Sequence, residues 1–143
     1  MKPWIRSAGA IAAGFLVTAV ASVAADAIMH ATGVFPSSPR AMSDALFVLA
    51  SGYRALFTAV GGFVTARLAP DRPMRHAWIL AGIGLAAGLA GVVFYFVAGK
   101  GQLGPAWYPV LIAVESLPCV WLGGRLAAGA RGRGEEAASR GSV

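Results

Sequence analysis

Residues 77–97 read AWILAGIGLAAGLAGVVFYFV, a run without one charged side chain. A helix needs about 20 mainly apolar residues to cross the roughly 30 Å hydrocarbon core of a bilayer. Three more apolar stretches of similar length occupy residues 5–25, 45–66 and 107–128. Backbone amides find no water in lipid, so each stretch must pair them internally as a helix. The sequence therefore predicts an all-α fold, an integral membrane four-helix bundle.

The composition of the chain agrees with a membrane protein of one domain. Hydrophobic residues make up 57% of the 143 residues and charged residues only 13%, whereas soluble domains carry about 25% charged residues. The mean hydropathy is +0.68. We expect residues 1–129 to form the transmembrane domain. Residues 130–143 are polar and rich in Gly and Ser, which predicts a disordered cytoplasmic tail.

The basic residues are distributed unevenly, and this predicts the topology. Nine of the 12 lie before the first stretch, between the second and third, or at and beyond the end of the fourth: Lys2, Arg6, Arg67, Arg72, Arg75, Arg125, Arg131, Arg133 and Arg140. Only Arg40 and Lys100 lie in the other two links. The positive-inside rule then places both termini in the cytoplasm, in a bacterial inner membrane. Since topology accounts for the net charge of +6, the basic excess does not indicate nucleic-acid binding.

The N-terminal stretch has a second interpretation. Residues 1–27, MKPWIRSAGAIAAGFLVTAVASVAADA, also have the basic start, apolar run and small residues before Asp26 that are typical of a cleaved signal peptide. The apolar run is longer than a usual signal core, which favours a membrane span. Cleavage after Ala25 would leave only three spans.

Two charged residues inside the apolar stretches are the main candidates for a site. Arg54 lies seven residues before Gly61, and Glu115 lies eight residues before Gly123. If these glycines share one level, the two charges differ in depth by about 1.5 Å. Each charge alone would cost about 2.5–3.5 kcal/mol in mid-membrane, so we expect a buried Arg54–Glu115 pair. Tyr53 points about 100° away around the helix and need not share this site.

Five further residues form a possible polar site around this pair: Asp26, His30, Thr58, Pro118 and Cys119. The Asp-His pair lies one helical turn apart, beyond the first apolar stretch, where it could relay protons or simply be a solvated helix end. Two such ligands are too few for a metal site. The sequence contains no nucleophile, base and acid in a catalytic pattern, so we predict no enzyme activity and no cofactor.

Several segments of the chain resemble a known group of proteins. They are ATGVFP (31–36), MSDALFVLASGYR (42–54), GGFVTARLAPDRPMRHA (61–77), GPAWYP (104–109) and LPCVWLGGRL (117–126). They resemble short four-span inner-membrane proteins of bacteria for which no activity is known. The resemblance covers most of the chain before the tail. It implies a four-helix membrane fold, and it implies no substrate, cofactor or functional residue.

Two functions fit these observations. The first is a structural or interaction protein of the lipid bilayer, in which the buried charge pair fixes helix register. The second is a small permease or ion-coupled carrier, forming a homo-oligomer because four short helices enclose little space. In the second, Glu115 binds a proton or cation and Arg54 tunes it or holds an anion. The sequence does not identify the solute.

Overall fold

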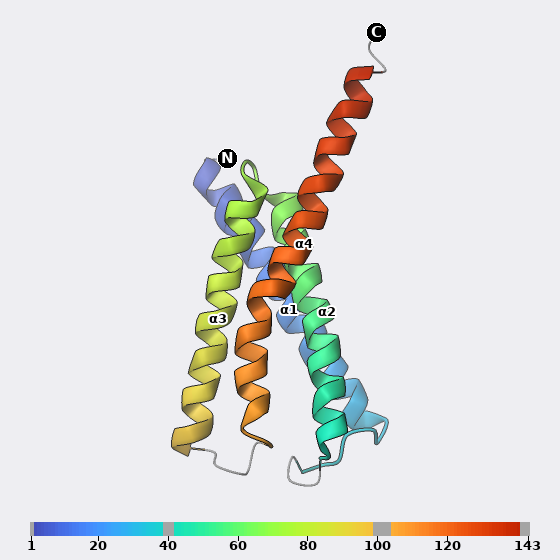
Figure 1. The fold of residues 1–143 in the computed structure, drawn as a ribbon, viewed down its shortest axis with the longest axis vertical. Coiled ribbons are helices and arrows are strands. Elements are labelled where there is room, and N and C mark those ends of the chain that lie inside the picture. The colour runs from blue at the N-terminus through green and yellow to red at the C-terminus, as the bar shows by residue number, and fades with distance from the viewer. Residues whose placement is uncertain (1, 39–41, 99–103, 141–143) are drawn as a thin grey trace.

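The computed structural model describes residues 2–38, 42–98 and 104–140. Its helices are α1 (Pro3–Ala31), α2 (Asp44–Leu68), α3 (Pro73–Ala98) and α4 (Trp107–Arg140), and the described ranges contain no strand. All four helices are long and apolar enough to cross a membrane. The predicted all-α, four-helix architecture is confirmed (Figure 1). Arg40 and Lys100 of the predicted outer links lie outside the described residues.

Proline, acidic and glycine residues mark several helix ends. Pro3 and Pro73 begin α1 and α3, where a missing backbone N–H is tolerated because it would have no helical partner. Asp44 lies in the first turn of α2, where its charge complements the helix dipole. After α1, Gly33 adopts a φ of 73°, a left-handed conformation that glycine accepts without strain.

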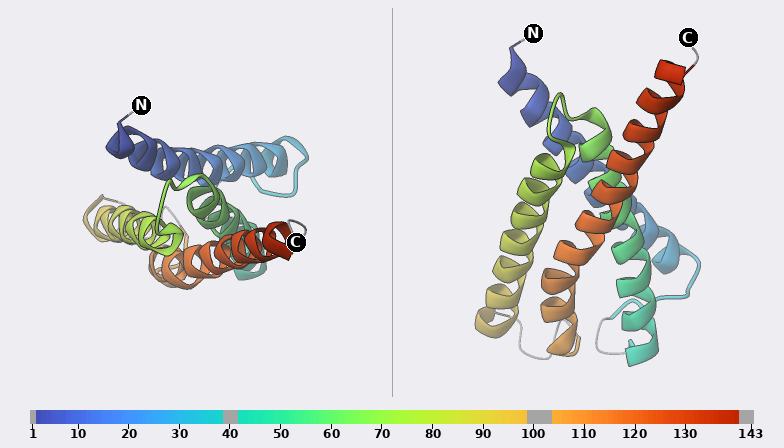
Figure 2. Two further views of the ribbon diagram at one scale, coloured as in Figure 1. Left: turned by 90° about the horizontal axis from the view of Figure 1, so that it is seen from above. Right: turned by 45° about the horizontal axis from the view of Figure 1, so that its top comes forward.

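Helix α2 is the centre of the bundle and contacts each of the other three helices. Seen from above, α1 and α4 lie on opposite sides of α2 (Figure 2). Within the described residues, α1 and α4 make no close backbone contact with each other, whereas α4 packs along both α2 and α3. The region between α1 and α4 is therefore not closed by direct packing of these two helices.

Glycines allow α2 to approach its two main neighbours closely. A Cβ atom on Gly14 of α1 would lie 1.9 Å from Thr65 Oγ1, and one on Gly61 of α2 would lie 2.0 Å from Thr18 Oγ1. The Thr18 hydroxyl also lies 3.2 Å from the Phe57 carbonyl oxygen, which it reaches across the α1–α2 contact. Small residues at helix crossings are the usual packing device in membranes.

The α2–α4 and α3–α4 contacts use the same device. A Cβ atom on Gly123 of α4 would lie 1.8 Å from the Ala59 carbonyl oxygen. On α3, a Cβ on Gly88 would lie 2.5 Å from the Cα of Ala113. A small core of four residues lies beside these contacts: Ala77, Leu80, Ala81 and Val120. Close contacts between helix backbones at glycines, more than the packing of large side chains, hold this bundle together.

The outward surface of the helices is strongly apolar. Exposed side chains include Leu16, Val20, Leu56, Val60, Val93, Phe94, Leu122 and Leu126. A soluble monomer rarely exposes contiguous apolar surface of this kind. The exposed surface is thus as apolar as expected for helices that are long and apolar enough to cross a membrane.

The C-terminal segment differs from the prediction. A disordered tail was expected from residue 130, but α4 continues as a helix to Arg140, and both chain ends lie at the same end of the bundle (Figure 1). Arg131 explains part of this extension, because its guanidinium donates to the carbonyl oxygens of Arg67 and Ala69 at the end of α2. Alanine, arginine and glutamate in the segment also favour helix.

Candidate functional site

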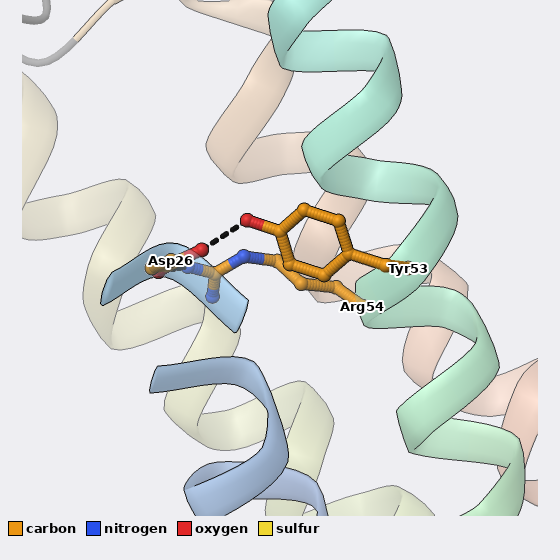
Figure 3. Close-up of polar contacts among 3 residues, drawn as sticks. All are labelled: Asp26, Tyr53 and Arg54. Atoms are coloured by element: carbon orange, nitrogen blue, oxygen red, sulfur yellow. Dashed lines mark hydrogen bonds and ion pairs between the residues drawn. The ribbon is translucent and has the colours of Figure 1, made fainter. Parts of the chain in front are cut away.

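Arg54 is paired with a carboxylate on a different helix from the one predicted. Its Nη2 donates to Asp26 Oδ2 on α1, and the hydroxyl of Tyr53 donates to Asp26 Oδ1 (Figure 3). In the described part of the chain, no ion pair joins Arg54 to Glu115. The expected Arg54–Glu115 pair is therefore corrected to an Asp26–Tyr53–Arg54 triad that joins α1 to α2.

The physical reason for this correction lies in the length of α1. The first apolar stretch stops at Ala25, but the helix continues to Ala31, so Asp26 lies within the bundle and not at a solvated rim. The separation of Tyr53 and Arg54 around α2 is overcome because both side chains are long and extend toward α1 (Figure 3). The four-residue spacing of Gly14, Thr18, Ser22 and Asp26 was the available signal, and it is a weak one, because each step turns about 40° around the helix.

An aromatic residue from the link after α1 packs beside the triad. Phe35 is 4% exposed, and its ring lies 6.5 Å from the Tyr53 ring in a stacked arrangement. The same ring meets His30 edge-on at 5.5 Å. No hydrogen bond joins His30 to Asp26 among the described residues, so the proton relay that was one of the two interpretations of this pair is not assembled. His30 instead supports the aromatic contact.

A cavity of about 500 Å³ lies between the four helices, where α1 and α4 fail to meet. Much of its wall is apolar or small, with Phe15 and Ala19 from α1 and Ala87 and Gly91 from α3. Its polar wall residues are Thr18, Ser22, Arg54, Thr58, Tyr108, Glu115 and Ser116. Small-molecule sites in proteins occupy roughly 300–1,000 Å³ and combine apolar walls with a few polar groups. This cavity has both properties.

Glu115 and Arg54 lie on the wall of this cavity at matching positions along their helices. Gly62 of α2 and Gly123 of α4 lie where these two helices cross. Gly62 comes eight residues after Arg54, and Gly123 comes eight residues after Glu115. The prediction that Arg54 and Glu115 lie at a similar depth therefore agrees with the position of the α2–α4 crossing. Arg54 nevertheless reaches toward α1, and Glu115 has neither an ion pair nor a hydrogen bond among the described side chains. The cavity thus contains an unpartnered carboxyl group.

Arg54 is only partly satisfied by the triad. Its Nε is buried and has no hydrogen-bond partner. Buried donors without a partner cost about 1–3 kcal/mol and are uncommon in native structures. The guanidinium therefore retains hydrogen-bonding capacity at the edge of the cavity that it lines.

The remaining predicted residues divide between the cavity and the outside of the bundle. Thr58 lines the cavity, whereas Pro118 and Cys119 do not. Helix α4 continues through Pro118, which faces outward, and Cys119 is a free, half-buried thiol. Among the residues that the structure describes, no three His, Cys, Asp or Glu side chains gather into a metal-binding group.

No protein-family model, curated protein or solved structure matches this chain. The function must therefore be inferred from the cavity and its charged residues.

Proposed function

We propose that this chain is a non-enzymatic multi-pass protein of the bacterial inner membrane that binds a small cationic solute in its inter-helix cavity. It would act as a small permease or ion-coupled carrier, with both termini in the cytoplasm. Four membrane-length helices, and the concentration of arginines toward the end that carries both termini, support this placement.

The unpartnered carboxyl group of Glu115 is the observation that carries this proposal. With all three groups ionised, the formal charges at the site are +1 on Arg54, −1 on Asp26 and −1 on Glu115, which sum to −1. Because Arg54 is paired with Asp26, the Glu115 carboxylate has no ion-pair partner among the described residues and is available to a ligand. Charges interact more strongly beside apolar walls than in water, and ionisable groups within membrane helices are functional candidates by default.

The rest of the wall favours a cation with an apolar body. Phe15 and Ala87 offer apolar contact, and the ring of Tyr108 can face a cation through its π-system. A bare metal ion would leave most of a 500 Å³ cavity unfilled. A protonated or quaternary amine with a hydrocarbon portion fits both the charge and the volume.

A thermal-shift experiment in detergent tests this assignment. The probe is benzyltrimethylammonium, and its neutral isostere neopentylbenzene is the control. We expect the cation to raise the unfolding temperature of the wild-type protein, and Glu115→Gln to weaken its binding by about tenfold. The neutral isostere should affect both proteins equally. Asp44→Asn removes a carboxylate that does not line the cavity, and it should bind like the wild type.

The proposal fails if Glu115→Gln and the wild type respond equally to the cation. It also fails if neither responds. Uptake of the same cation into proteoliposomes then separates a carrier, which moves it across the bilayer, from a protein that only binds it.

A structural or interaction role is the second candidate. It is favoured by the triad, in which one carboxylate of α1 accepts from two neighbouring side chains of α2. Such an arrangement fixes the register of the two helices whether or not a solute is bound. Under this role, Glu115 would contribute to neither binding nor stability.

A further inference from the structure

A second hollow, of about 690 Å³, lies at the end of the bundle that carries both termini. Three arginines from three different helices line it: Arg6 of α1, Arg67 of α2 and Arg131 of α4. No acidic side chain lines it among those that the structure describes. The three arginines that line the hollow carry a formal charge of +3, and the hollow shares no lining residue with the cavity that contains Glu115.

Arg131 is held in place on the wall of this hollow. Its Nη2 lies 2.9 Å from the Ala69 carbonyl oxygen and also contacts that of Arg67. These carbonyls belong to the end of α2, where the last backbone acceptors have no helical partner and carry the negative end of the helix dipole. A guanidinium has five N–H donors, so Arg131 keeps donors available for a ligand.

The rest of the wall is apolar. Leu68 is 52% exposed and lies beside Pro70, while Ala130 and Ala138 of α4 complete this part of the wall. A hollow lined by both arginines and apolar residues, at the end of membrane-length helices, complements a molecule with a phosphate and hydrocarbon chains. Basic pockets between helices at the cytoplasmic side bind anionic lipid head groups in this way.

We propose that this hollow binds the phosphate of an anionic phospholipid from the cytoplasmic leaflet. The guanidinium groups of Arg6, Arg67 and Arg131 supply charge-assisted, bidentate hydrogen bonds of the kind that phosphate oxygens accept. The alkyl chains run along Leu68 and the neighbouring apolar surface. This inference rests on the membrane placement given under the proposed function, but not on the cationic solute.

Native mass spectrometry of the detergent-purified protein tests the inference. We expect the wild type to retain phosphatidylglycerol in preference to phosphatidylcholine, and Arg67→Gln to reduce the retention by about tenfold. Arg131→Lys keeps the charge but loses the planar fork, and it should also reduce retention. Arg75→Gln is the matched control, because Arg75 lies near the same end of the bundle, is exposed, and does not line the hollow.

Equal loss of lipid in Arg67→Gln and Arg75→Gln would overturn the inference, because it would show general charge attraction. Displacement of the lipid by an equal concentration of inorganic phosphate would also overturn it, since the site would then recognise free phosphate. Flotation of the wild type with liposomes tests the membrane placement separately from the lipid site. Protein that floats but shows no preference for phosphatidylglycerol contradicts only the lipid site.

Discussion

Asp26 of α1 and Arg54 of α2 form an ion pair, and Tyr53 donates to the same carboxylate. The two helices are thus joined by polar contacts in a bundle that otherwise relies on close backbone approach at glycines. The side chains of the ion pair are 29% and 31% exposed for Arg54 and Asp26. Under the proposed membrane placement, the exposed part of these side chains is not solvated by water, so each partner depends on the other for its charge to be neutralised.

Removal of the Asp26 charge should destabilise the protein. In Asp26→Asn, Arg54 keeps its charge without a counter-ion, which costs about 2.5–3.5 kcal/mol on membrane-insertion scales. Thermal unfolding in detergent measures the effect. The exchanged variant, Asp26→Arg with Arg54→Asp, should recover part of the loss. If Asp26→Asn is as stable as the wild type, the pair does not hold α1 to α2.

Loss of the Tyr53 hydroxyl should have a smaller effect. Tyr53→Phe removes one hydrogen bond to Asp26 and keeps the ring contacts with Phe35 and Phe57. We expect a loss of about 1 kcal/mol, measured by the same unfolding assay. In the Asp26→Asn background, Tyr53→Phe should cost less than in the wild type, because the two residues share one contact. Equal costs in both backgrounds would argue against that contact.

An added methyl group at the α2–α4 crossing should separate the two helices. In Gly123→Ala the new Cβ would lie 1.8 Å from the Ala59 carbonyl oxygen, so backbone must move. Overpacking of this kind costs roughly 1–3 kcal/mol. The control is Gly129→Ala on the same helix, where a Cβ meets nothing within 4 Å. Gly129→Ala should leave the stability of the protein unchanged or raise it by about 0.5–1 kcal/mol. Similar losses of stability in both variants would contradict a close α2–α4 crossing at Gly123.

The topology can be tested with single cysteines in the Cys119→Ser background. Val34 lies in the link after α1 and is 43% exposed. A cysteine introduced as Val34→Cys should react with a membrane-impermeant maleimide in intact spheroplasts. Ala138→Cys on the extension of α4 should react only after lysis. The reverse pattern would place the termini outside the cytoplasm.

Most of the fold was predictable from the sequence, because lipid leaves a long apolar segment few alternatives to a helix. The helix ends were less predictable. Polar residues end an apolar run without ending a helix, so α1 continues to Ala31 and α4 to Arg140. Arg131 illustrates the difficulty, since its role depends on the position of the end of α2.

The candidate site was only half predictable. Arg54 was conspicuous because a charge inside an apolar run is costly, and its similarity in depth to Glu115 agrees with the α2–α4 crossing. Its partner was not predictable, because the choice between Asp26 and Glu115 depends on how each helix is rotated about its axis. That rotation is set by the fit of Gly14 and Gly61, which periodicity alone does not reveal.

The attachment of α1 has a mechanical consequence. This helix is held to α2 at two places, the glycine crossing near its middle and the triad toward its C-terminal end. It also packs on α3, and among the described residues it makes no close backbone contact with α4. The C-terminal part of α1 is therefore the segment of the bundle whose attachment depends most on a single ion pair.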